Sequence, residues 1–250
     1  SAGPLLYNKQ VVALLLFTMA SFNGDPMELV RHLNGAGATT EVITQLENIK
    51  ERHPQAYQLN HLDFLKAHLL TQTGKQQKAN KLLRILVRQK SPLRDLAFLM
   101  LLNNVVGTPL EKQQDYLESF LREFPEHHKW QEIAFRYATL LEKDQQLKEA
   151  LNWYNRVWHL KRNPISRKAA LSHARIHLVR QAPSEAITDL KTLIELNPRD
   201  DVALSAANAL YQLQPLSLSS ESSIRIRTMV FMNNRQAKRT REYLTYLLEH

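Results

Sequence analysis

The chain has 250 residues, of which 44% are hydrophobic and 23% are charged, and its net charge at pH 7 is +9. It contains no cysteine, which excludes disulfides, thiolate catalysis and cysteine-ligated metal sites. No apolar run reaches the roughly 18 residues that a spanning helix needs, so we expect no transmembrane segment. The positive charge favours an acidic partner, such as nucleic acid, anionic lipid or peptidoglycan.

The amino-terminal residues 1–37 are predicted to form helices that cap the rest of the chain. The apolar run Val11–Ala20 follows Lys9 and has two interpretations, the core of a signal peptide or a buried first helix. No small-x-small cleavage site follows it, which favours the helix. After a turn with Pro26 at a first helical position, Met27–Asn34 is predicted to be a short helix.

Small residues recur at one spacing in the middle of the chain. Ala138 and Ala150 are twelve residues apart, and so are Ala174 and Ala186, with a predicted turn between the members of each pair. Two antiparallel helices joined by such a turn carry these alanines at the same height. Because neither side chain is bulky, the two helix backbones can approach closely. The spacing therefore predicts stacked helical hairpins.

The same phase extends along the chain. Positions 42, 79, 113, 150 and 186 follow one another at intervals of 37, 34, 37 and 36 residues, a period close to that of tetratricopeptide repeats. We expect an all-α fold, a right-handed α-α superhelix of about six or seven antiparallel hairpins, with the repeats over residues 38–213. The first helices are predicted at 56–73, 92–106, 128–142 and 165–180, and the second helices at 40–53, 75–90, 109–124, 146–162 and 184–196. Leu101 and Gln113 break the small-residue rule, so the repeats are degenerate.

The carboxy-terminal part has a different character. A helix over 199–213 is followed by a Pro/Ser/Leu-rich linker, and residues 214–250 are predicted to form this linker and a basic hairpin with helices at 222–232 and 235–249. Ala237 takes the repeat position in that hairpin. Six basic residues and no acidic residue occur between positions 225 and 241, namely Arg225, Arg227, Arg235, Lys238, Arg239 and Arg241. They indicate either a solvated helix face or a patch that faces an anion.

Other candidate ligand-binding residues are few. Trp153 and Trp158 are five apart on one predicted helix, so one can pack in the core while the other faces a ligand. His173 and His177 have a spacing that can bind zinc, but residue 174 is alanine where a metalloprotease has glutamate, and the sequence implies no third ligand. We therefore expect no metal site, no cofactor and no catalytic residue.

A family resemblance rests on three stretches. These are Ser91–Ala97, Tyr154–Ala170 and Leu218–Leu244, which carry Ser-Pro-Leu-x-Asp-x-Ala, Tyr-Asn-Arg-Val-Trp with Asn-Pro-Ile-Ser, and Arg-x-Arg with Arg-Gln-Ala-Lys. Residues 90–250 resemble the superhelical amino-terminal domain of soluble lytic murein transglycosylases. The resemblance implies a non-catalytic domain that binds or positions peptidoglycan in the bacterial periplasm, beside a catalytic domain that would follow residue 250.

Two functions remain open after these observations. One is the peptidoglycan-binding domain of a transglycosylase, and the alternative is a tetratricopeptide-like scaffold that binds a protein or peptide on its concave face. The second is compatible with a cytoplasmic location. Nucleic acid is not expected as the partner, because no aromatic/basic interleaving or reading helix accompanies the charge.

Overall fold

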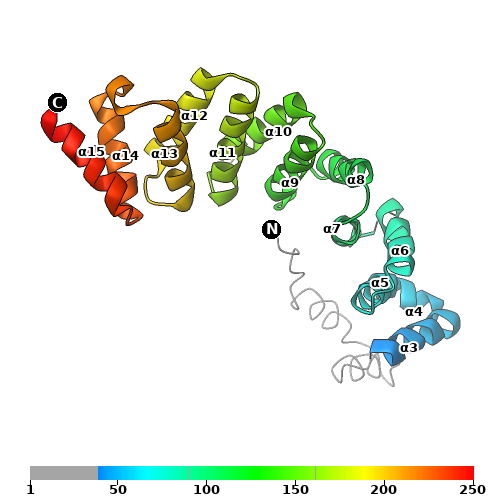
Figure 1. The fold of residues 1–250 in the computed structure, drawn as a ribbon. Helices are drawn as coiled ribbons and strands as arrows, with labels where there is room; N and C mark the ends of the chain where they lie inside the picture. The colour runs from blue at the N-terminus through cyan, green and yellow to red at the C-terminus, as the bar shows by residue number, and fades with distance from the viewer. Residues whose placement is uncertain (1–38, 90, 161) are drawn as a thin grey trace. The chain divides into compact units, whose positions relative to one another are not determined.

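The computed structural model describes residues 39–250 apart from residues 90 and 161, and every regular element in this part of the chain is a helix (Figure 1). The predicted all-α fold is confirmed. The predictions for residues 1–37, including the segment Val11–Ala20, lie outside the described residues. The chain divides into two compact units, one up to Tyr116 and one over Leu117–His250, which are described separately below.

The first unit contains consecutive antiparallel helices close to the predicted positions. They are α3 (Thr39–Arg52), α4 (Pro54–Leu59), α5 (Leu62–Gln72), α6 (Gln76–Arg88), α7 (Arg94–Asn104) and α8 (Leu110–Glu123), the last of which contains the boundary between the units. The core of this unit is built from leucines of successive helices, of which Leu46, Leu62 and Leu83 are fully buried.

The prediction of one helix over 56–73 is wrong, because α4 ends at Leu59 and α5 begins at Leu62. The backbone of His61 is left-handed, with φ of 51°, which a continuous helix does not allow. The Asn60 side chain stabilises the end of α4, because its Nδ2 donates to the carbonyl of Ala56 at 2.8 Å.

The second unit continues the alternation of first and second helices. It contains α9 (Trp130–Lys143), α10 (Leu147–Leu160), α11 (Pro164–Val179), α12 (Pro183–Leu196), α13 (Asp201–Leu213), a short 3₁₀ helix at Leu216–Leu218, α14 (Glu221–Asn233) and α15 (Ala237–Glu249). Each helix from α9 to α15 contacts the next, and Figure 1 shows them in sequence order along the unit. The predicted linker is therefore partly helical.

The predicted alanine pairs are buried as expected. Ala138, Ala150, Ala174 and Ala186 have no exposed surface, and neither have Ala67 and Ala79, a third pair that is twelve residues apart. Each second alanine lies five residues after a left-handed residue in the turn between the helices, namely Gly74, Gln145 or Gln181. A 6→1 backbone hydrogen bond closes each of these turns, as in the donation from the Gln146 amide to the Leu141 carbonyl at 2.9 Å.

In the last hairpin, the residue five positions after the left-handed residue is not the predicted Ala237. Its left-handed residue is Arg235, with φ of 56°, so the repeat position falls on Thr240 and not on the exposed Ala237. Thr228, twelve residues before Thr240, is buried on α14. The assignment of the repeat position to Ala237 was therefore wrong by almost one helical turn.

Candidate functional site

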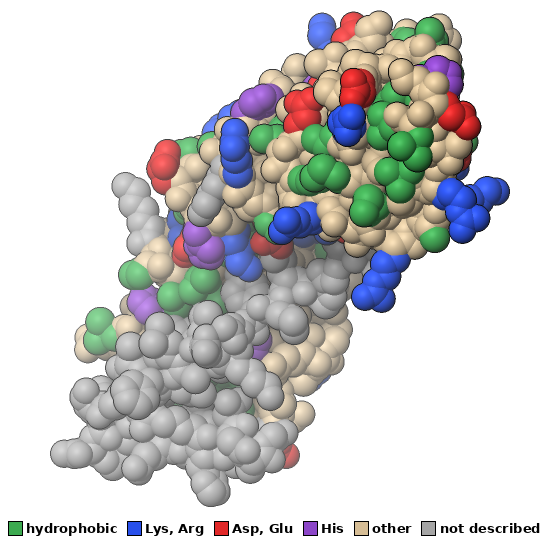
Figure 2. All heavy atoms as spheres, turned by 90° about the vertical axis from the view of Figure 1, so that its left-hand side faces the viewer, with side chains coloured by type: hydrophobic (Ala, Val, Ile, Leu, Met, Phe, Trp, Pro, Cys, Tyr) green, Lys and Arg blue, Asp and Glu red, His purple; other side chains and the backbone are tan. Residues whose placement is uncertain are grey.

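The candidate site is a shallow groove on the outer face of the carboxy-terminal hairpin. It has a volume of about 570 Å³ and is lined by Met232, Arg235, Ala237, Thr240, Arg241, Leu244, Thr245 and Leu248. Six of these residues lie on α15 at intervals of three or four, so they share one face of that helix. Figure 2 shows this end of the second unit, where hydrophobic side chains form a patch with basic and acidic side chains around it.

The apolar side chains of the groove are accessible to solvent. Met232 is 55% exposed, Leu244 is 42% exposed and Leu248 is 87% exposed. The earlier second helices of this unit differ, because α10 is contacted by α11 and α12 is contacted by α13. None of the described helices covers the corresponding face of α15. This face therefore has the composition of a helix-packing surface but is open to solvent.

Two of the predicted basic residues lie in the groove with unpaired charges. Arg235 comes from the turn between α14 and α15, and Arg241 comes from the middle of α15. Neither guanidinium has an ion-pair partner among the described residues. Lys238 is exposed one turn before Arg241. The groove thus combines apolar contact area with uncompensated positive charge.

Arg225 is exposed outside the groove and is already paired. Its Nη2 lies 2.5 Å from Oε1 of Glu221, one turn earlier on α14. This pair satisfies the charge locally, so Arg225 adds little to the field of the groove.

The expectation that Arg227 faces a ligand is wrong. Its side chain is completely buried, and it donates to the carbonyl oxygens of Ser223 at 3.2 Å and Gln214 at 3.3 Å and to the hydroxyl of Ser219. Its guanidinium lies 5.3 Å from the centre of the Tyr243 ring. Burial lowers the pKa of this guanidinium. Arg227 therefore fastens the linker to α14 and has a structural role.

Arg239 also contacts the protein and not the groove. Its guanidinium carbon lies 3.4 Å from the centre of the Tyr211 ring, and its Nη1 lies 3.7 Å from Oε2 of Glu242. The Tyr211 hydroxyl donates to Glu242 at 2.8 Å. These contacts join α13 to α15, so they hold the groove-bearing helix in place.

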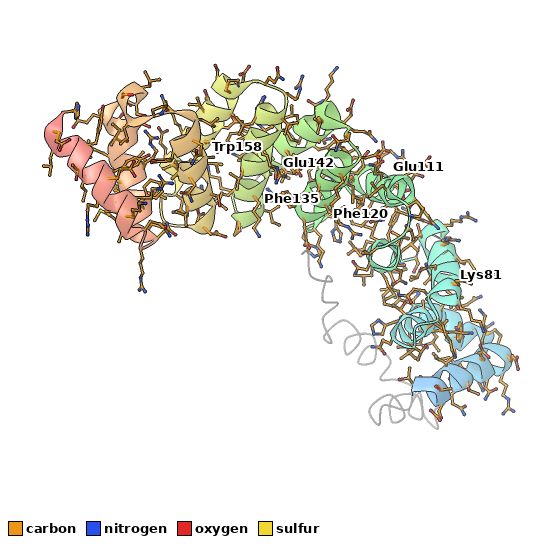
Figure 3. The ribbon with its side chains drawn as sticks, viewed as in Figure 1. Lys81, Glu111, Phe120, Phe135, Glu142 and Trp158 are labelled. Carbon is orange, nitrogen blue, oxygen red and sulfur yellow. The ribbon has the colours of Figure 1, made fainter. Side chains whose placement is uncertain are left out.

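The two predicted tryptophans have different neighbours, and neither lies in the groove. Trp153 packs edge-to-face against Tyr137, with ring centres 5.1 Å apart, and the Arg156 guanidinium carbon lies over the Trp153 ring, 4.3 Å from its centre. Trp158, labelled in Figure 3, packs instead toward α11, with its ring centre 5.8 Å from that of His173. Both rings are half-buried, and their contacts are those of helix packing.

A second cluster of polar side chains lies between α11 and α12. Nδ1 of His173 is 2.7 Å from Oδ2 of Asp189, and Nε2 of His177 is 3.9 Å from the same oxygen. Burial and the neighbouring His173 lower the pKa of His177, against the opposing charge of Asp189. Asp189 on α12 thus supplies the third polar side chain that the spacing of the two histidines did not imply.

Met232, Leu244 and Leu248 are not among the predicted ligand-facing residues, although the sequence carries a signal for two of them. Leu244 and Leu248 are four apart, with Arg241 one turn earlier. This pattern gives α15 a mixed apolar and basic face. Pairing residue 174 with 186 places residue 187, and not Asp189, opposite His173, so the alanine spacing does not single out Asp189.

Comparisons with known proteins agree with this fold. No family model matches the chain, and no curated protein matches it. Among solved structures, a tetratricopeptide repeat protein from Parabacteroides merdae superposes with a TM-score of 0.52 at 16% identity, covering 90% of this chain and 91% of that protein. The chain has a tetratricopeptide-like helical repeat fold.

Two other tetratricopeptide-like matches were found. MamA from Desulfovibrio magneticus has a TM-score of 0.48 at 14% identity and covers 70% of this chain and 95% of its own. YrrB, described as a TPR protein with an unusual peptide-binding site, has the same TM-score and identity and covers 72% of this chain and 89% of its own. None of these proteins is a lytic transglycosylase, so the comparisons add no support to that resemblance. No helix within residues 39–250, where described, is long and apolar enough to span a bilayer.

Proposed function

We propose that this tetratricopeptide-like chain is a scaffold for a protein partner, and that the groove on α14 and α15 binds an amphipathic helix with acidic side chains. The single observation that carries the proposal is the combination of exposed apolar side chains on one face of α15 with the unpaired Arg235 and Arg241 at the same groove. Tetratricopeptide-like solenoids generally bind partners along an extended concave surface, whereas this groove lies on the outer face of the last hairpin.

The apolar part of the groove fits a helix. In this unit, the earlier second helices α10 and α12 each contact a following helix. Leu244 and Leu248 are one turn apart on α15, so they form a ridge that a second helix can straddle with residues at i, i+3, i+4 and i+7. Covering them removes apolar area from water, at about 25 cal/mol per Å².

The charged part of the groove selects acidic side chains. Arg235 and Arg241 flank the apolar ridge and have no carboxylate partner among the described residues. Acidic residues on the polar face of the incoming helix would pair with them. Such rim contacts contribute more to specificity and association rate than to affinity.

Peptidoglycan is the competing ligand that the sequence resemblance implied. The carboxylates of its stem peptides could pair with Arg235 and Arg241, but a glycan strand would leave Leu248, which is 87% exposed, without an apolar partner. A protein helix uses both halves of the groove. The observations therefore favour the protein partner.

The proposal can be tested by selecting helical peptides from a random display library on the purified chain. Two groove variants serve as probes, R235E/R241E for the charges and L244S/L248S for the apolar ridge. Their matched controls change exposed residues elsewhere in the second unit, R162E/R199E for charge and L160S/V179S for apolar area. Sedimentation with purified peptidoglycan is measured in parallel on the same variants.

We expect the selected peptides to be amphipathic and acidic, and to lose binding in both groove variants while both controls retain it. Peptides that bind all variants equally would overturn the proposal. Sedimentation with peptidoglycan that depends on Arg235 and Arg241 but not on the leucines would replace it with the cell-wall function. A dimer that dissociates in L244S/L248S would identify the groove as a contact between two copies.

A further inference from the structure

The cluster between α11 and α12 has the composition and the geometry of a metal site. His173 and His177 are four residues apart on α11, so both rings extend from the same face of that helix. Asp189 extends from α12 toward them, and one nitrogen of each histidine and one carboxylate oxygen all lie within 4.8 Å of one another. Among the described residues, this is the one group of three such side chains that converge in this way.

The alanine packing explains why the three side chains meet. Ala170, Ala174 and Ala186 are completely buried at the contact between α11 and α12, so the two helix backbones can lie close together. A short aspartate on α12 can then reach a histidine on α11. The small residues that mark the repeat therefore also bring the candidate ligands within range.

A hydrogen bond explains the position of only one of the two histidines beside Asp189. Nδ1 of His173 hydrogen-bonds to Oδ2 of Asp189 at 2.7 Å. Nε2 of His177 approaches the same oxygen at 3.9 Å, which is too long for a hydrogen bond. His177 thus points at a carboxylate that it does not reach.

The distances fit an ion placed between the three groups. Zinc binds nitrogen and carboxylate oxygen at about 2.0–2.2 Å, so two ligands at the tetrahedral angle lie about 3.4 Å apart. The observed separations of 2.7 and 3.9 Å lie on either side of this value. The third separation, between the two histidine nitrogens, is no more than 4.8 Å, so binding an ion requires the three side chains to adjust.

We propose that His173, His177 and Asp189 bind a divalent transition-metal ion of the Zn²⁺ type, with the fourth coordination position open to water. Two imidazoles and one carboxylate are a ligand set that suits zinc better than Mg²⁺ or Ca²⁺, which prefer oxygen ligands. The side chains of the three residues are between 14% and 17% exposed. The cluster is therefore enclosed enough to hold an ion and open enough to admit one.

Bound metal would link the two helices of a single repeat. Since the ion binds the folded hairpin and not the separated helices, it would stabilise the fold by an amount that rises with the logarithm of its free concentration above the Kd. This inference is independent of the groove on α14 and α15, because the two sites share no residue.

The test is isothermal titration of the full chain with Zn²⁺ after treatment with a chelator, together with thermal unfolding at increasing Zn²⁺. The variants are H177A and D189N, the second of which keeps the size of the side chain. The controls are H159A and H128A, which remove histidines outside the cluster. Circular dichroism of each variant establishes that it is folded before titration.

We expect one equivalent of Zn²⁺ to bind the native chain and to raise its unfolding temperature. H177A and D189N should each weaken Zn²⁺ binding by roughly 10- to 100-fold or more, because loss of a metal ligand costs at least as much affinity as loss of a residue that hydrogen-bonds to a ligand. The controls should bind Zn²⁺ as the native chain does. Equal affinity in all the folded variants, or loss of binding only in H128A, would overturn the proposal. Tighter binding of Mg²⁺ than of Zn²⁺ would also contradict it.

Discussion

The guanidinium of Arg167 on α11 forms a bidentate ion pair with the carboxylate of Asp200, the N-cap residue of α13. Nε and Nη2 of Arg167 donate to Oδ2 and Oδ1 of Asp200 at 2.5 and 2.8 Å. The same carboxylate accepts from the backbone amide of Ala203 at 2.8 Å. Arg167 also donates to the carbonyl oxygens of Leu193 and Asn197, each at 3.0 Å. One arginine therefore connects three consecutive helices and fixes the spacing between two repeats.

Removing this connection should weaken the second unit. We expect R167M to lower the free energy of unfolding by about 2 kcal/mol, because it removes a donor from the carbonyl oxygens of Leu193 and Asn197 and removes the ion-pair partner of Asp200. D200N should cost less than D200A, since asparagine can still cap α13 and alanine cannot. Urea unfolding of the full chain measures all three. Equal stability of D200N and D200A would show that the cap contributes nothing.

The same pair predicts a dependence on pH. Burial acts to raise the pKa of Asp200, but the hydrogen bonds from Arg167 and Ala203 outweigh it and lower the pKa below its usual range. The folded state therefore binds this proton less readily than the unfolded state. The stabilisation is complete above the unfolded pKa of about 4 and is lost as the pH falls through the lower folded value. The stability difference between the native chain and D200N should shrink over that acidic range, and a difference that is constant with pH would contradict the assignment.

Replacing the left-handed turn residues with glycine is predicted to stabilise the chain and not to destabilise it. Gln145 and Gln181 have φ near 60°, a conformation in which a residue with a Cβ costs about 1 kcal/mol or more relative to glycine. Q145G and Q181G should each stabilise the chain by about 0.5–1 kcal/mol. The control K143G changes the last residue of α9 and should not stabilise the chain, because glycine has a lower helix propensity than lysine. Thermal unfolding distinguishes these outcomes.

The revised repeat position in the last hairpin can be checked by adding bulk. The Thr240 hydroxyl is buried at this position, whereas Ala237 is exposed. T240L should destabilise by about 1–3 kcal/mol through overpacking, and A237L should have little effect on unfolding. The reverse order would restore Ala237 as the repeat position.

Arg227 and Arg225 provide a matched pair on α14. R227M removes the donor from the Gln214 and Ser223 carbonyls in a fully buried site and should cost about 2–3 kcal/mol. R225M breaks only an exposed pair with Glu221 and should change stability by less than about 0.5 kcal/mol. Chemical denaturation of both variants decides whether Arg227 is structural.

Much of the fold could be predicted from the sequence because closely packed helices require small residues at regular intervals. Alanines such as Ala174 and Ala186 recur wherever two backbones approach closely, and the period follows from the hairpin length. The break at His61 left no such record, since it depends on a backbone conformation of one residue. The shift from Ala237 to Thr240 was missed for a related reason: threonine can occupy a small-residue position as well as alanine.

The candidate sites were less predictable than the fold. A run of six basic residues looks uniform in sequence, yet Arg227 is buried, Arg239 stacks on Tyr211, and only Arg235 and Arg241 line the groove. These arginines differ in burial and contacts because different helices pack beside them. Similarly, the role of Asp189 depends on its distance from His173 across the hairpin, which no local pattern specifies.

The central claim, that α14 and α15 present a groove for an acidic amphipathic helix, is tested most directly by fluorescence anisotropy with a peptide selected on the native chain. Its affinity should fall at least roughly tenfold, equivalent to about 1.4 kcal/mol, in R235E/R241E and in L244S/L248S, and should be unchanged in R162E/R199E. The same affinity for the native chain and both groove variants would contradict the claim.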